Sequence, residues 1–352
     1  MSEDRKPLLG AAIAAGLALY AIAADRHSRR AATLERVGNG ELGRRASEPQ
    51  HIPAIGWWSI VKRVAAAVSR DNISLMAAGV AFYALLSMAP ASTALVALYG
   101  LMFDPSQVQA QLASLEGVVP AQARGVIADQ LTAVVQSNSS RLSIGLIVSL
   151  AVTLWSANSA TSAMMQALNV AYVERERRSL LRYYASALLL TAASVLFATA
   201  ALLLVAVIPA IIGLMPFAPS GRALVVWVRW PVLVVLAAAG LAVVYRYAPS
   251  RRQPRWSWAS WGAVLAILLW LAASALFSLY VGQFATYNRT YGSLGAVVVL
   301  LIWFWLTAFA VLLGAELNAE MERQTLHDTT TPPPKPLGRR GAFAADTVAP
   351  SS

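Results

Sequence analysis

Long apolar segments separated by short polar connections constrain this chain more than any other feature. Six such segments occur, and each is near or above the ~20 residues that a helix needs to cross a hydrocarbon core. Several are rich in Ala, Leu and Val without a regular polar face, as expected for helices surrounded by lipid and by one another. The six segments cover residues 74–102, 142–169, 184–214, 223–245, 257–282 and 293–315.

Composition agrees with this pattern. The chain is 58% hydrophobic and only 13% charged, whereas soluble proteins carry about 25% charged residues. We therefore predict an all-α, polytopic transmembrane helix bundle with six core spans. The absence of cysteine excludes disulfides and thiolate metal sites.

A shorter apolar stretch, residues 7–24, could be a seventh spanning helix, a signal peptide or a membrane-surface anchor. The sequence DRHSRR that follows it is strongly basic, which disfavours export. We therefore expect an uncleaved anchor within an N-terminal segment of residues 1–56.

Basic residues are distributed unevenly between the ends of the six segments. When the ends are taken alternately, Arg and Lys crowd one side of the membrane, as the positive-inside rule requires of the cytoplasmic side. Both ends of the six-helix core are thus predicted to be cytoplasmic, and the net charge of +11 reflects topology and not nucleic-acid binding. The crowded side holds the basic stretches 62–70, 175–182, 246–255 and 323–340, and the other side holds only Arg124, Arg141, Arg222 and Arg289.

Two segments outside the predicted spans could serve as docking surfaces. Residues 103–141 contain two amphipathic patterns, each after a proline, and the charge rule places them outside. The C-terminal segment, residues 326–352, is rich in proline and is predicted to be a disordered cytoplasmic tail.

A stripe of uncharged polar residues marks the end of the second predicted span, in TLWSANSATSAMMQALNVAY (153–172). At about 3.6 residues per turn, Asn158, Ser162, Gln166 and Asn169 fall within a narrow arc of one helix. Lipid offers such groups no partner, so the arc must face other helices, a cavity or water. Interhelical hydrogen bonds explain Ser and Thr well. A polar pathway is the alternative, favoured by two Asn and a Gln on one stripe.

Five further residues in or beside the first and last predicted spans are candidates for a polar pathway or for interhelical contacts: Ser87, Pro90, Tyr291, Glu316 and Asn318. Pro90 removes a backbone hydrogen bond and is expected to kink its helix, with Ser87 able to satisfy a freed carbonyl. Tyr291 belongs to a polar entry to the last span. Glu316 lies near its cytoplasmic end, where pairing with an arginine is the simpler interpretation and a proton or ligand site the sharper one.

Three motifs together resemble the YihY/BrkB family of bacterial inner-membrane proteins. They are LMAAGVAFYALLSMAP, LWSANSATSAMMQALNVAYVERERRSLLR and YGSLGAVVVLLIWFWLTAFAVLLGAELNAEME, in that order within residues 57–325. The resemblance implies a six-helix bundle in the inner membrane with both core ends cytoplasmic. It also implies a poorly defined activity, linked in some members to serum resistance or to envelope lipid handling. The family was once labelled ribonuclease BN.

The resemblance assigns a catalytic role to none of the residues that match its motifs. These residues are Ser87, Pro90, Trp155, Asn169, Tyr291, Gly292, Gly295, Gly314, Glu316 and Asn318.

A nuclease activity finds little support in the residues themselves. Metal-dependent hydrolysis needs clustered His and acidic ligands. The histidines, His27, His51 and His327, all lie outside the six-helix core, and no phosphate-binding loop is present. We therefore predict a protein that is not an enzyme, without cofactor, metal or nucleic-acid partner.

Two functions follow for such a protein. The first is a transporter-like protein that contacts membrane lipids and handles envelope lipid or a small solute. The alternative is a non-transporting scaffold that binds protein partners through residues 103–141 or through the C-terminal tail.

Overall fold

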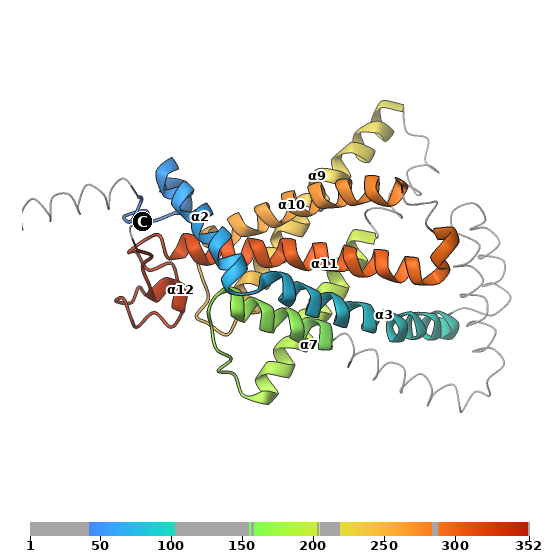
Figure 1. Ribbon diagram of the computed structural model, residues 1–352, viewed down its shortest axis with the longest axis horizontal. Coiled ribbons are helices and arrows are strands. Elements are labelled where there is room, and N and C mark those ends of the chain that lie inside the picture. The colour runs from blue at the N-terminus through green and yellow to red at the C-terminus, as the bar shows by residue number, and fades with distance from the viewer. Residues whose placement is uncertain are drawn as a thin grey trace, which may run out of the picture.

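The computed structural model describes residues 42–102, 155, 158–202, 204, 219–283 and 288–350. Every regular element in these ranges is a helix (Figure 1). A helix without a label covers residues 158–171. In chain order the labelled elements are η1 (Pro49–His51), α2 (Ala54–Arg70), α3 (Ile73–Met102), α7 (Leu180–Leu202), α9 (Pro219–Tyr247), α10 (Trp256–Gln283), α11 (Asn288–Glu322) and α12 (Phe343–Asp346).

Four of these helices contain stretches long and apolar enough to cross a membrane. They are Leu180–Phe197 in α7, Trp227–Tyr247 in α9, Trp256–Tyr280 in α10 and Val297–Glu322 in α11. A fifth is reached if α2 and the first part of α3, which meet at a bend of 61°, are counted as one broken span. The all-helical membrane fold is therefore confirmed.

The predicted count of six spans is not confirmed. Most of the predicted second span, 142–169, lies outside the described residues, as do the anchor at 7–24 and the external segment 103–141. The first predicted span coincides with α3, and the last four coincide with α7, α9, α10 and α11 over the residues described.

The helix α11 lies at the centre of the bundle, between α10 and α3 in Figure 1. It approaches α10 closely where Gly262 and Gly314 face each other. A Cβ atom on either glycine would collide with the carbonyl oxygen of the other. Small residues permit such contact between membrane helices, so the two glycines allow α10 and α11 to pack closely here.

Large apolar side chains remain exposed along the outward faces of the long helices. Leu181 and Leu189 on α7 are 82% and 72% exposed, and Leu276 and Leu279 on α10 are similarly open. A soluble protein rarely leaves such extended apolar surface uncovered. These faces therefore fit contact with lipid.

The four basic stretches of the sequence meet at one end of the bundle, which we call the basic end. Arg63 pairs with Glu320 at 2.7 Å and joins α2 to α11. Arg251 in the α9–α10 connection pairs with Glu322 at 2.6 Å. The backbone N–H of Arg177 donates to Ser250 Oγ at 3.0 Å, which ties the third stretch to the second.

The predicted disorder of the C-terminal segment is wrong for residues 326–350, which fold onto the basic end (Figure 1). Arg340 organises this segment: its buried guanidinium donates to the carbonyl oxygens of Leu326, His327 and Ala345 at 2.7–3.0 Å. Thr329 Oγ1 also donates to Glu322 at 2.8 Å. Composition alone could not reveal these contacts, because they depend on how the folded segment lies against itself and against α11.

Candidate functional site

The predicted polar stripe lies on the helix over 158–171 and packs partly against α7. Tyr183 Oη donates to the carbonyl oxygen of Ser162 at 3.1 Å and accepts from Gln166 Nε2 at 3.3 Å. Thr161 and Thr191 join the same two helices at 2.7 Å. Hydrogen bonds between helices therefore account for much of this stripe.

Two atoms of the stripe stand apart from these bonds. Asn158 Oδ1 and Ser162 Oγ are buried and find no hydrogen-bond partner among the described residues. Buried polar atoms are nearly always paired, so these two mark the part of the stripe that interhelical bonding does not explain.

Asn169 has a different role from the one its place in the stripe suggests. Its Oδ1 accepts the backbone N–H of Ser250 at 2.7 Å, and its Nδ2 donates to Glu176 at 3.1 Å. The side chain is 5% exposed. Asn169 therefore fixes the α9–α10 connection against the end of its own helix, at the basic end.

Asn318 joins three parts of the bundle. Its Oδ1 accepts the N–H of Gly262 at 2.8 Å, and its Nδ2 lies 3.2 Å from the carbonyl oxygen of Ala259 and 3.3 Å from Tyr172 Oη. The residue is fully buried. These contacts make it an interhelical tie within the core.

Glu316 lies elsewhere, toward the junction of α2 and α3. It is 1% exposed, and the charges of Arg70 and Asp71 act on it. Its Oε1 has no hydrogen-bond partner in the described part of the chain. No ion pair to Glu316 is formed by a described residue, so the simple pairing expected from the sequence is not found there.

The other predicted residues do not join the stripe in the described structure. Ser87 Oγ donates to the carbonyl oxygen of Ala84, one turn earlier in α3. Pro90 lies within α3, which continues to Met102 as one helix. The side chains of Pro90 and Tyr291 are outside what the structure describes.

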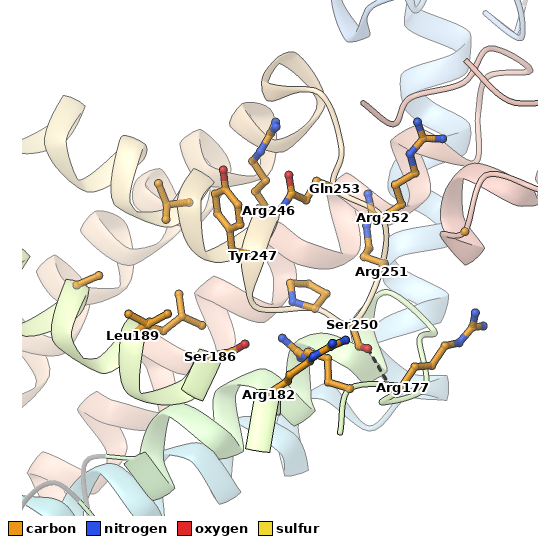
Figure 2. A pocket seen from close by; sticks show the side chains of 16 residues that line it. Arg177, Arg182, Ser186, Leu189, Arg246, Tyr247, Ser250, Arg251, Arg252 and Gln253 are labelled. Atoms are coloured by element: carbon orange, nitrogen blue, oxygen red, sulfur yellow. Dashed lines mark hydrogen bonds between the residues drawn. The ribbon is translucent and has the colours of Figure 1, made fainter. Parts of the chain in front are cut away.

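A cavity of about 680 Å³ opens at the basic end, between the start of α7 and the α9–α10 connection. We call it the arginine pocket. Figure 2 shows Arg177 and Arg182 close to Ser250, with residues of the end of α9 and the following loop on the other side. The arginines that line it are Arg177, Arg178, Arg182, Arg246, Arg251 and Arg252.

Carboxylates neutralise only part of this charge. Arg178 pairs with Glu176 at 2.8 Å, and Arg251 pairs with Glu322. Burial would raise the pKa of Glu176, but hydrogen bonds from Arg178 and Asn169 outweigh it and lower the pKa to about 2. The remaining four of the six arginines have no carboxylate partner among the described residues. The pocket is therefore strongly positive.

Two nearby residues, Glu174 and Tyr172, have a raised side-chain pKa instead. Burial raises the pKa of Glu174, against a 2.6 Å hydrogen bond from the N–H of Phe343. Burial also raises the pKa of Tyr172, although the charge of Arg251, 4.6 Å above its ring, opposes this. Neither residue lines the arginine pocket.

A second cavity, of about 720 Å³, lies among α7, α9, α10 and α11. Its wall is almost entirely apolar, with Phe197, Trp230 and Trp270 as its largest side chains. Leu190, Ala193 and Val243 line both cavities. The apolar cavity and the arginine pocket are therefore neighbours, one running among the spans and the other at the basic end.

The arginines of this pocket stand out in the sequence, but there they indicate only which side of the membrane is cytoplasmic. The signal for a pocket was their density in two stretches that flank spans, 175–182 and 246–255. What no pattern showed is that these stretches, far apart in the chain, close on each other through Arg177 and Ser250.

The described residues contain no cluster of three or more His, Asp or Glu side chains placed to hold a metal ion. His51 lies at the end of η1 and His327 in the folded C-terminal segment. His27 is outside the described ranges.

Comparison with known proteins places the chain in a family. The model of the family described as virulence factor BrkB matches residues 64–337. The ribonuclease-like protein YfkH of Bacillus subtilis is 32% identical over 253 residues, which cover 70% of this chain and 89% of YfkH. No solved structure matches the chain.

Shorter matches come from membrane proteins named UPF0761. The one from Idiomarina loihiensis is 36% identical over 109 residues, covering 31% of this chain and 37% of that protein. The one from Tolumonas auensis is 36% identical over 95 residues, covering 27% and 31%. The present chain thus spans about a third of these two relatives. With the family match and the apolar helices taken together, this chain belongs to the virulence factor BrkB family of membrane proteins.

Proposed function

We propose that this protein is transporter-like and moves an amphipathic envelope lipid, without being an enzyme. The observation that carries the proposal is the pairing of a strongly positive pocket with an adjacent apolar cavity. A site that takes one charged headgroup and one hydrocarbon chain needs both environments side by side. The walls that the two cavities share, on α7 and α9, supply that arrangement.

We further propose that the membrane is the bacterial inner membrane and that the basic end faces the cytoplasm. The grouping of the four basic stretches at one end supports this orientation, because cytoplasmic flanks carry an excess of Arg and Lys. A headgroup would then be taken from the cytoplasmic leaflet.

A proteoliposome assay of fluorescent phospholipid scrambling tests the proposed function. The change Ala237→Phe would fill the apolar cavity, whereas Val235→Phe adds the same ring at a position on α9 that is 69% exposed. We expect Ala237→Phe to abolish scrambling and Val235→Phe to retain it. Equal activity of both variants, or an inserted wild-type protein that moves no lipid, would contradict the proposal.

A scaffold is the second candidate, favoured by the folded C-terminal segment. Leu337 and Phe343 are 49% and 38% exposed on it and could contact a protein partner at the basic end. Such a role predicts loss of function from Leu337→Ser with lipid scrambling unchanged. The nuclease-like name of YfkH belongs to that relative, and we propose no nuclease activity here.

A further inference from the structure

We infer that the arginine pocket recognises a lipid whose headgroup ends in a phosphate monoester or diphosphate. Such a group carries about two negative charges or more near neutral pH. The inference rests on the proposed function, because it names the class of lipid that the same site would take.

The charge of the pocket is the first argument. Six arginines line it, and only Arg178 and Arg251 have carboxylate partners in the described structure. A phosphodiester headgroup with a single negative charge would leave most of this charge unbalanced. A terminal phosphate balances more of it and offers more oxygens to the planar guanidinium donors, which match phosphate geometry well.

Unpaired donors are the second argument. Arg251 has a fully buried side chain, and its Nε and Nη1 have no acceptor among the described residues. Nη1 of Arg252 and Nε of Arg246 are also buried, and neither has an acceptor among the described residues. A buried charged donor without an acceptor is costly. Arg246 and Arg251 also lie over the rings of Trp256 and Tyr172, at 4.5 and 4.6 Å, so these buried guanidinium groups act on a phosphate in the pocket through their charge.

The surroundings argue for a lipid and against a soluble phosphate. Leu189, which is 72% exposed, lies on the pocket wall together with Leu190. The apolar cavity begins on the same wall and runs among the spans. A free phosphate or a nucleic acid has no part that would occupy this apolar surface, whereas the chain of a lipid does.

The rest of the pocket is built to hold its shape. Asn169 and the N–H of Arg177 both anchor Ser250 in the α9–α10 connection. The backbone N–H of Arg252 donates to the carbonyl oxygen of Gly341 at 2.9 Å, so the folded C-terminal segment supports the same loop. The arginines are therefore carried on a connection that is fixed from two directions.

Binding measurements on the full-length protein in mixed micelles test the inference. The probes are short-chain phosphatidic acid, phosphatidylglycerol and phosphatidylcholine, with inorganic phosphate as the free anion. We expect phosphatidic acid to bind about tenfold more tightly than phosphatidylglycerol, the effect of one additional charge-assisted contact. Phosphatidylcholine and inorganic phosphate should bind more weakly still.

The double change Arg177→Gln/Arg182→Gln should remove this preference. Both side chains are exposed and have no carboxylate partner in the described structure, so their loss should leave the melting temperature unchanged. Arg45→Gln/Arg339→Gln removes the same two charges at exposed positions outside the pocket and is the matched control. We expect binding of phosphatidic acid to fall about tenfold or more in the double variant only.

Three results would overturn the inference. They are equal binding of phosphatidic acid and phosphatidylglycerol, an unchanged affinity in the double variant, and inorganic phosphate binding as tightly as the lipid. Headgroup selectivity without any scrambling would refute the proposed transport and leave the inference intact. Scrambling without headgroup selectivity would refute the inference alone.

Discussion

Replacing Gly262 by Ala tests the close packing of α10 against α11. A Cβ at this position would meet the carbonyl oxygen of Gly314 and lie 2.5–2.6 Å from the side chain of Asn318. The carbonyl is backbone and cannot turn aside. Asn318 is fully buried and could move only by giving up its bonds to Gly262 and Ala259. The helices α10 and α11 must therefore separate.

The size of the effect follows from these contacts. Overpacking of a well-packed core costs about 1–3 kcal/mol. Interhelical hydrogen bonds in membranes contribute ~0.6 kcal/mol each, and Asn318 would lose two of them. Gly262→Ala should therefore lower the free energy of unfolding by roughly 2–4 kcal/mol, measured by reversible unfolding in mixed micelles with SDS.

Gly79 in α3 supplies the control, because a Cβ built there meets no atom within 4 Å. Gly79→Ala should leave stability unchanged or raise it by up to about 1 kcal/mol, the usual gain from replacing Gly by Ala within a helix. Equal stability of the two variants would refute the account of α10–α11 packing.

Three further outcomes are expected. Glu322→Leu should cost about 3–5 kcal/mol of unfolding free energy, since it strands the buried charge of Arg251. A double change that also replaces Arg251 by Leu should recover part of the loss, and no recovery in chemical denaturation would count against this. Because the pKa of Glu176 is depressed to about 2, its contribution is present above the ordinary value of 4.5 and is lost as pH falls from there toward 2. Glu176→Gln should remove that part of the acid dependence of thermal unfolding, and an identical pH profile would contradict it. Finally, Asn169→Leu should destabilise the protein more than Gln166→Leu, because Asn169 is buried between Ser250 and Glu176 whereas Gln166 is exposed. A larger cost for Gln166→Leu in the same assay would reverse the assignment.

The parts of the fold that could be predicted from sequence are those set by local chemistry. Apolar length alone located the helices that became α3, α7, α9, α10 and α11. The alternating charge indicated which stretches would share one end, and the ion pairs of Arg63 and Arg251 place them together there.

What sequence could not supply is the geometry made by distant residues. Asn169 reads as one more amide of a polar stripe, yet its partners, Ser250 and Glu176, lie on connections that periodicity does not relate to it. The C-terminal segment is proline-rich and its composition predicts disorder, but Arg340 donates to four of its carbonyl oxygens. The arginine pocket exists only because such connections close on one another.

Cross-linking with a phospholipid that carries a photoreactive group on its acyl chain tests the central claim most directly. Peptide mapping of the labelled protein would locate the chain. The account predicts labelling of residues that line the apolar cavity, such as Phe197 and Trp270, and its loss in the Ala237→Phe variant. Labelling confined to outward faces, at Leu276 and Leu279, with the cavity residues unmodified, would contradict it.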